Sequence, residues 1–229
     1  MTRSNAANTH GTVLRVLILA LFILSATSIS HAGQASYDMP STVDRSANYL
    51  FFLHNYFVEM KGPDGACKYY DILQAFAEKD FTVISEVRSG QIVPAEYAKK
   101  ITGQVTRLLG AGVPPENITV AGHSKGGVIT LCVASQLGNP KVRFVVMAGC
   151  EIKPLAQTYP DFTMLSGDFL SVYASSDSVA GSCETAFSKS VQGISSREIE
   201  LESAKGHRLF FQPEDLWLEP VMTWIRQKH

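Results

Sequence analysis

Residues 117–127 read Asn-Ile-Thr-Val-Ala-Gly-His-Ser-Lys-Gly-Gly, and this stretch decides the fold. A strand-like run, Asn117 to Ala121, leads into a glycine-rich turn, and an apolar helix-like segment follows up to Leu137. Such a turn holds its serine, here Ser124, in a strained conformation with the hydroxyl projecting from the sheet edge. Glycine is needed two residues before and after it, since a side chain there would crowd strand and helix. We predict that Ser124 is a nucleophile; a glycine-rich turn needed only for packing is the alternative.

The rest of the chain alternates strand-like and helix-like segments from Ala47 onward. Strands are expected at 49–53, 81–84, 117–121, 142–148, 169–174 and 198–201, and helices at 67–79, 95–109, 126–137 and 213–226. Several strands are apolar on both faces, which is typical of a parallel sheet covered by helices on both sides. The sequence therefore predicts one α/β domain, residues 33–229, with a mostly parallel sheet of about six strands. Ligands bind such sheets beyond the carboxyl ends of the strands, so functional residues should directly follow strands.

A serine hydroxyl is a weak nucleophile and needs a base that a third group holds in one tautomer. Of the histidines in the predicted domain, His207 comes directly after the last strand, in Lys205-Gly206-His207-Arg208. We predict that His207 is this base, with an ordinary loop histidine as the alternative. His54 lies at the end of the first strand, and His123 lies within the turn and points away from the serine.

The third group should be a carboxylate that follows a strand lying between Ser124 and His207 in the chain. Asp177 directly follows the strand at 169–174 and fits this position. A loop-capping role is the alternative for Asp177. The other candidates are less well placed, because two of them precede that strand and one lies deeper in the next segment; they are Asp161, Asp168 and Glu184.

The order Ser124, Asp177, His207, each after its own strand, resembles the α/β-hydrolase superfamily. The likeness covers nearly the whole predicted domain, from Tyr49 to the C-terminal helix. The continuation Ser-Lys-Gly-Gly at 124–127 is similar to small single-domain bacterial serine hydrolases near the dienelactone-hydrolase branch. That branch commonly uses cysteine as its nucleophile, so its substrate is not carried over to this chain.

Two backbone N–H groups are expected to hold a developing oxyanion. The turn presents the N–H of Lys125 beside the Ser124 hydroxyl. The second donor of the family lies just after the first strand, often within His-Gly-X, where this sequence has His54-Asn55-Tyr56. Asparagine adopts left-handed conformations as glycine does, so we expect the loop to form. Tyr56 is preferred to Asn55 as the donor, and His54 then shapes the loop.

The site is expected to be open and to need no cofactor. Many members of the family carry a cap after the strand that follows the nucleophile helix, but only about twenty residues separate the strands at 142–148 and 169–174. The crossover itself takes a dozen or more residues, so no cap fits.

Arg88 follows the second strand and is a candidate for binding a substrate carboxylate, with a salt bridge as the alternative. No metal-ligand spacing, phosphate loop or dinucleotide signature is present.

Four cysteines lie in the predicted domain, at positions 67, 132, 150 and 183. Cys150 ends the strand at 142–148, and Cys183 lies six residues beyond Asp177 at the same sheet edge. A disulfide between them would tie down the loop that bears the acid, and we predict that it forms. In the family, the helices near Cys67 and Cys132 usually cover opposite faces, so a second bridge is not expected. Small buried thiols are the alternative for any of the four.

The N-terminus has the order of a secretory signal. Arg3 and Arg15 are followed by nine apolar residues, Val16 to Leu24, and then by small residues that end in Ser30-His31-Ala32. We expect cleavage after Ala32 and a secreted or periplasmic protein with no stable membrane association; an uncleaved anchor is the alternative. The apolar run is short against the roughly 20 residues of a spanning helix.

The composition narrows the class of protein. The chain of 229 residues has a net charge of −1, and 18% of its residues are charged, which argues against a nucleic-acid partner. Together these observations predict an exported, monomeric carboxylesterase-type serine hydrolase that acts on a small-molecule ester. The alternatives are an acyltransferase or thioesterase with the same triad, and a non-catalytic binding protein of the same fold.

Overall fold

The computed structural model describes residues 35–36 and 38–227. The predicted signal sequence, residues 1–32, lies outside these residues, and its cleavage stays a prediction. Within the part of the chain that is described, no helix is long and apolar enough to cross a membrane.

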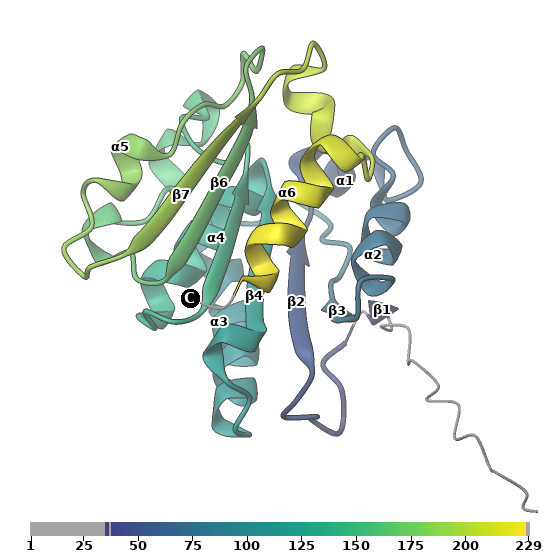
Figure 1. Ribbon diagram of the computed structural model, residues 1–229. Helices are drawn as coiled ribbons and strands as arrows, with labels where there is room; N and C mark the ends of the chain where they lie inside the picture. The colour runs from purple at the N-terminus through teal and green to yellow at the C-terminus, as the bar shows by residue number, and fades with distance from the viewer. Residues whose placement is uncertain (1–34, 37, 228–229) are drawn as a thin grey trace, which may run out of the picture. The chain divides into compact units, whose positions relative to one another are not determined.

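The described residues form one seven-stranded sheet in which all neighbouring strands are parallel (Figure 1). The order along the sheet is β1-β3-β2-β4-β5-β6-β7. The strands are β1 (Ala35–Ser36), β2 (Asn48–Leu53), β3 (Phe81–Ile84), β4 (Ile118–His123), β5 (Arg143–Met147), β6 (Asp168–Ala174) and β7 (Ser195–Leu201). The predicted α/β class and its six strands are confirmed. The edge strand β1 was not predicted, because two residues in a polar segment leave no hydrophobic pattern.

The described chain also contains six α-helices and four short 3₁₀ helices. The α-helices are α1 (Tyr56–Lys61), α2 (Tyr69–Ala77), α3 (Pro94–Gly110), α4 (Lys125–Leu137), α5 (Glu184–Phe187) and α6 (Asp215–Arg226). The 3₁₀ helices are η1 (Pro115–Asn117), η2 (Lys153–Thr158), η3 (Phe162–Met164) and η4 (Gly206–Phe211). Helix α1 was not predicted, because six residues are too few to establish a helical period.

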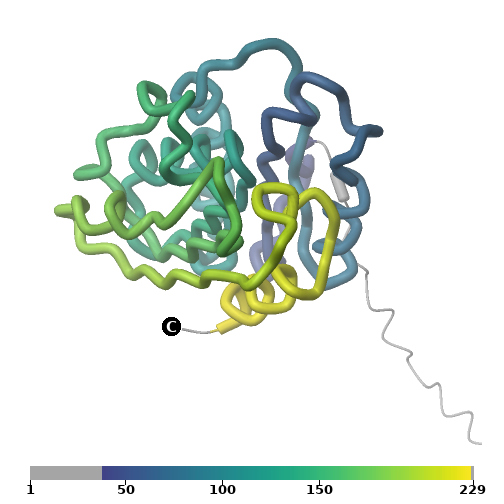
Figure 2. Tube along the Cα trace, turned by 90° about the horizontal axis from the view of Figure 1, so that it is seen from above, coloured from purple at the N-terminus to yellow at the C-terminus, as the bar shows by residue number. Residues whose placement is uncertain are grey.

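Helices cover both faces of the sheet because alternate strand residues point to opposite sides. In β2, Leu50 and Phe52 pack with α2 and α6, whereas Tyr49 and Phe51 pack with α3 and α4. Figure 2 shows the yellow helix α6 on one side of the sheet and the teal segments of α3 and α4 on the other. This double burial explains why the central strands are apolar at successive positions.

The connection between β5 and β6 confirms that the domain has no cap. Every residue of this connection is described, and it forms only η2 and η3. The carboxyl end of β4, where α4 begins, is therefore not enclosed by an inserted domain.

Candidate active site

A strained turn joins β4 to α4 at Ser124. Ser124 has φ 56° and ψ −120°, a conformation that costs a residue with a side chain on the order of 1–3 kcal/mol. A Cβ on Gly122 would lie 2.2 Å from the carbonyl oxygen of Gly126, and a Cβ on Gly126 would lie 1.9 Å from that of Leu53. Both positions therefore require glycine for steric reasons.

Three side chains from different strand ends form a continuous hydrogen-bonded chain. The Nε2 atom of His207 lies 2.8 Å from the Ser124 Oγ atom, and its Nδ1 atom lies 2.9 Å from Oδ2 of Asp177. Asp177 follows β6, and His207 lies in η4 after β7. The second oxygen of Asp177 accepts hydrogen bonds from the N–H groups of Val179 and Ala180, at 2.8 and 3.0 Å. The carboxylate is thus held in place from both sides.

The surroundings of Asp177 keep it ionised and fix the tautomer of His207. Burial alone would raise the pKa of Asp177, but hydrogen bonds from His207 and from two backbone N–H groups outweigh it and lower that pKa. An ionised carboxylate only accepts, so Nδ1 of His207 carries the hydrogen of this contact. In the neutral ring Nε2 is then free to accept the proton of the Ser124 hydroxyl.

The other carboxylates considered from the sequence lie away from this chain of hydrogen bonds. Asp168 is the first residue of β6 and therefore lies at the amino ends of the strands, whereas Ser124 lies at the carboxyl ends. Asp161 caps η3 and accepts a hydrogen bond from the N–H of Thr163. Glu184 is an exposed residue in the first turn of α5. Asp177 is the carboxylate that contacts His207.

Comparisons with known proteins identify the fold. No family model and no curated protein sequence matches the chain. Among solved structures, a protein provisionally assigned as a dienelactone hydrolase from Klebsiella pneumoniae aligns with a TM-score of 0.58 at 15% identity, covering 82% of this chain and 90% of that one. SOBER1 from Arabidopsis thaliana has a TM-score of 0.54 at 13% identity, over 79% and 98% of the two chains. Esterase PE8 has a TM-score of 0.52 at 16% identity, over 79% and 92%.

The protein has the α/β-hydrolase fold. The resemblance noted from the order of Ser124, Asp177 and His207 is confirmed at this level. In this α/β-hydrolase fold, the strained turn after β4 and the two loops after β6 and β7 bring the three side chains together.

The loop after β2 forms without a left-handed residue at Asn55. Asn55 is extended, with φ −78° and ψ 175°, so it does not use the left-handed conformation that asparagine can adopt. It is instead the N-cap of α1, and its Oδ1 accepts a hydrogen bond from the N–H of Val58 at 2.9 Å. The Nδ2 group donates to Nδ1 of His123 at 3.0 Å. Asn55 thus caps α1 and contacts the residue before Ser124.

Tyr56 and Lys125 are the first residues of α1 and α4. The N–H groups of a first helical turn lack partners within the helix, and within the described chain neither of these two N–H groups donates a hydrogen bond to another residue. Both residues line the same cavity as Ser124 and His207. The two N–H groups are therefore available to donate hydrogen bonds to an oxygen atom bound next to Ser124.

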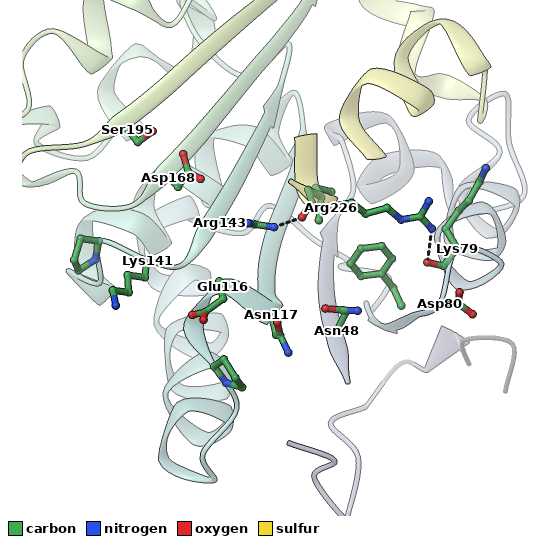
Figure 3. A pocket seen from close by; sticks show the side chains of 14 residues that line it. Asn48, Lys79, Asp80, Glu116, Asn117, Lys141, Arg143, Asp168, Ser195 and Arg226 are labelled. Atoms are coloured by element: carbon green, nitrogen blue, oxygen red, sulfur yellow. Dashed lines mark hydrogen bonds between the residues drawn. The ribbon is translucent and has the colours of Figure 1, made fainter. Parts of the chain in front are cut away.

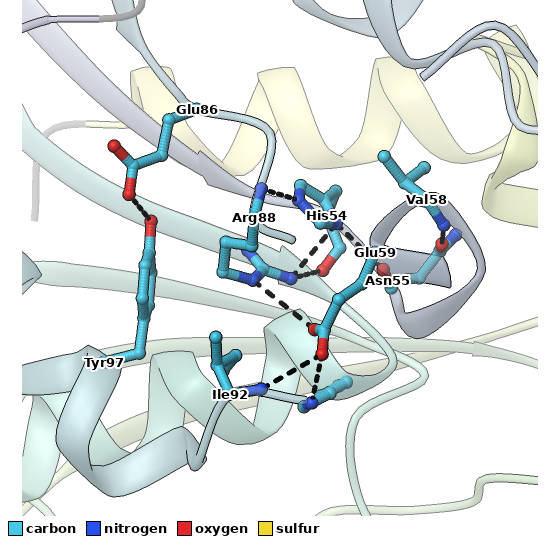
Figure 4. Close-up of polar contacts among 9 residues, drawn as sticks. His54, Asn55, Val58, Glu59, Glu86, Arg88, Ile92 and Tyr97 are labelled. Atoms are coloured by element: carbon cyan, nitrogen blue, oxygen red, sulfur yellow. Dashed lines mark hydrogen bonds and ion pairs between the residues drawn. The ribbon is translucent and has the colours of Figure 1, made fainter. Parts of the chain in front are cut away.

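Arg88 does not take the place predicted for a substrate ligand. Its side chain is 1% exposed, and its Nε atom lies 3.8 Å from Oε2 of Glu59. Its guanidinium also donates to the carbonyl oxygen of His54 and lies over the ring of Tyr97, 5.3 Å from the ring centre. The prediction that Arg88 binds substrate is corrected: it follows the right strand, but its side chain turns into the protein (Figure 4).

His54 is a neutral, buried part of the loop. Its Nε2 atom accepts the backbone N–H of Arg88 at 2.7 Å, so Nδ1 carries the hydrogen and donates to the carbonyl oxygen of Asn55 at 2.8 Å. Burial, followed by the charge of Arg88, lowers the pKa of His54 to about 3. His54 does not line the cavity beside Ser124.

This lowered pKa predicts an acid-sensitive fold. Below pH 6.5 the unfolded chain protonates His54 and the folded chain does not, so folding stability falls as pH falls. Between pH 7 and pH 5 the loss from His54 should be on the order of 2 kcal/mol. Urea unfolding at both pH values measures it, and His54→Gln should unfold with a smaller pH dependence. Equal pH dependence in the two proteins would contradict this assignment.

The cavity beside Ser124 is open and mainly apolar. It has a volume of about 820 Å³. Its walls come from α1, from the segment 91–94 before and at the start of α3, from η2, and from the loop after Asp177. Among the described residues no cluster of three or more His, Cys, Asp or Glu side chains is arranged to hold a metal ion.

The predicted disulfide between Cys150 and Cys183 is confirmed. The N–H of Gly181 also donates to the carbonyl oxygen of Cys150 at 3.1 Å, so the loop after Asp177 is attached to the end of β5 twice. Cys67 and Cys132 are free and buried in the clusters on opposite faces of the sheet, as expected.

A second cavity, of about 910 Å³, lies at the end of the sheet away from Ser124, where the strands begin (Figure 3). Its lining residues sit at the amino ends of the strands, and the guanidinium of Arg143 there donates to the carbonyl oxygens of Ile225 and Gln227 at the end of α6. Arg226 donates to the carbonyl oxygen of Lys79 at 3.0 Å. These contacts attach the end of α6 to β5 and to the turn between α2 and β3. Neither Ser124 nor His207 lines this cavity.

Proposed function

We propose that the protein is an exported serine hydrolase that cleaves carboxylic esters. The observation that carries the proposal is the unbroken hydrogen-bond chain from Asp177 through His207 to Ser124, which ends in an open cavity. The fold is shared with esterase PE8, which is consistent with this chemistry. The Cys150–Cys183 disulfide supports export to an oxidising compartment.

The reaction follows from the roles of these atoms. Nε2 of His207 takes the hydroxyl proton of Ser124 while Oγ attacks the ester carbonyl carbon, and the carbonyl oxygen becomes an oxyanion. The N–H groups of Lys125 and Tyr56 donate to that oxygen. His207 then gives its proton to the leaving alcohol as the tetrahedral intermediate collapses to an acyl-enzyme. Water attacks the acyl carbon by the same route, and the carboxylic acid leaves.

The cavity walls favour an apolar acyl group. The described residues expose eight large apolar side chains, and four of these line this one cavity; they are Tyr56, Met60, Val93 and Val179. Exposed apolar surface gathered around a pocket is typical of a binding site. Each methylene buried there contributes about 0.8 kcal/mol, which is roughly fourfold in affinity. We therefore propose that esters of medium-length fatty acids are better substrates than acetates or charged esters.

A panel of p-nitrophenyl esters tests both the reaction and the preference. We expect kcat/KM to rise from the acetate to the hexanoate, and the Met60→Ser and Val179→Ser variants to flatten that rise. Val191→Ser changes an apolar side chain that is exposed elsewhere and is the matched control. A flat series in the wild-type protein would refute the preference.

Labelling with a fluorophosphonate tests whether Ser124 is a nucleophile at all. Mass spectrometry should find the adduct on the peptide that contains Ser124. An unlabelled Ser124 in folded protein would instead support a non-catalytic binding protein of the same fold. Hydrolysis in the presence of added alcohols or thiols, with analysis of the acyl products, separates a hydrolase from an acyltransferase.

A further inference from the structure

Three segments around the cavity meet at one buried carboxylate, that of Glu59 on α1 (Figure 4). Its Oε1 atom lies 2.7 Å from Nζ of Lys125 and accepts the backbone N–H of Ile92 at 3.3 Å. Its Oε2 atom lies 3.8 Å from Nε of Arg88. The side chain of Glu59 is 0% exposed and that of Lys125 is 6% exposed. Glu59 thus connects α1, the turn after β4, and the loop between β3 and α3.

The residues on either side of Ser124 are both attached to α1. Before it, the ring of His123 accepts a hydrogen bond from Asn55, the N-cap of α1. After it, Lys125 pairs with Glu59, and its Nζ lies 5.5 Å from the ring centre of Tyr56. The two N–H groups proposed for the oxyanion, those of Tyr56 and Lys125, belong to the two segments that these contacts join.

A buried ion pair is a poor explanation of stability alone. Removing two charges from water costs about as much as their attraction returns, so apolar side chains of similar size would pack as well. An apolar contact has no preferred direction. The short contact between Nζ of Lys125 and Oε1 of Glu59, in contrast, fixes the distance and orientation of the two side chains. The pair is therefore suited to setting the position of one segment against the other.

We propose that Glu59 is a positioning residue which, through Lys125, holds the N–H groups of Tyr56 and Lys125 at the spacing that an oxyanion requires. This inference rests on the proposed esterase function. The N–H groups act on charge that develops only in the transition state, so a loss of position lowers kcat and leaves KM nearly unchanged.

The double variant Glu59→Gln/Lys125→Met removes both charges of the pair at once, while Arg88 keeps its contacts with the carbonyl oxygen of His54 and the ring of Tyr97. Glutamine retains an acceptor for the N–H of Ile92, and methionine retains most of the length of Lys125. Kinetics on p-nitrophenyl butyrate should show kcat per active site about 100-fold lower, with KM changed less than about threefold. Active sites are counted by complete fluorophosphonate labelling, so protein that has merely unfolded does not lower this kcat.

Two further measurements separate positioning from packing. The affinity of an aryl trifluoromethyl ketone, which forms an oxyanion on Ser124, should fall by the same factor as kcat/KM, whereas the affinity of the butyrate product should not change. Lys125→Arg retains the pair with Glu59 and should recover most of the activity.

Lys100→Met is the matched control, since it removes a half-exposed pair with Glu86 on the same β3–α3 loop. It should retain wild-type kcat. The proposal is overturned if the double variant keeps kcat per active site within about threefold of wild type, or if its loss lies in KM alone. A wild-type protein that neither hydrolyses esters nor is labelled would overturn the proposed function, and this inference with it.

Discussion

The Ser124→Ala variant is expected to hydrolyse p-nitrophenyl butyrate with kcat lowered about a million-fold, to the level of the oxyanion contacts alone. Alanine removes the only atom that bonds to the acyl carbon, so no acyl-enzyme forms. His207→Ala should lose activity to a similar extent, because Oγ then keeps its proton. Asp177→Asn should lose about 10⁴-fold, since an amide can hold the wrong tautomer of the ring.

Combining these changes should lower the rate little further, because the three groups act as one unit. Steady-state kinetics on purified variants measure the losses, and circular dichroism checks that each is folded. Ser188→Ala is the control for a serine-to-alanine change, since Ser188 is exposed at the end of α5. If Ser124→Ala retained more than about 1% of wild-type activity, a different nucleophile would have to be sought.

The Gly126→Ala variant is expected to lose the native fold or to lose several kcal/mol of stability. The added Cβ would lie 1.9 Å from the carbonyl oxygen of Leu53 and 2.7 Å from that of His54. These are backbone atoms at the end of a central strand, so they cannot move aside as a flexible side chain can. The cost should exceed about 3 kcal/mol, a large part of the total stability of a domain.

Gly103→Ala is the matched control for this change. Gly103 lies inside α3, and a Cβ there would meet no atom within 4 Å. Alanine should stabilise the helix by about 0.5–1 kcal/mol. Urea unfolding followed by circular dichroism compares the two variants. An unfolding free energy of Gly126→Ala within 1 kcal/mol of the wild type would show that the turn tolerates a side chain.

Much of the fold could be predicted because the pattern of apolar residues in each strand indicates which of its faces are buried. The segment 81–84 was predicted with the bounds of β3, and the helix predicted at 95–109 is α3 within one residue at each end. The disulfide was predictable because Cys150 follows β5 and Cys183 follows β6, so both lie beyond the carboxyl ends of the strands. Helix α1 escaped prediction because it is short and its residues show no clear period.

Position after a strand predicts where a residue lies but not where its side chain points. Asp177 and Arg88 were selected by the same argument. The side chain of Asp177 contacts His207, whereas that of Arg88 turns inward to Glu59. No sequence signal distinguishes these two directions. The only hint of a buried role for Glu59 is a single acid among apolar neighbours in Tyr56-Phe57-Val58-Glu59-Met60.

The sequence by itself determined the α/β class, the parallel sheet, the absence of a cap and the glycines around Ser124, because each depends on local pattern or on the length of a connection. Only the tertiary structure decided which side chains hold the residues on either side of Ser124 in place. Glu59 and Lys125 are 66 residues apart, and Asn55 and His123 are 68 apart. Contacts over such separations arise only when the parallel sheet places the carboxyl ends of β2 and β4 side by side, and neither segment alone specifies them.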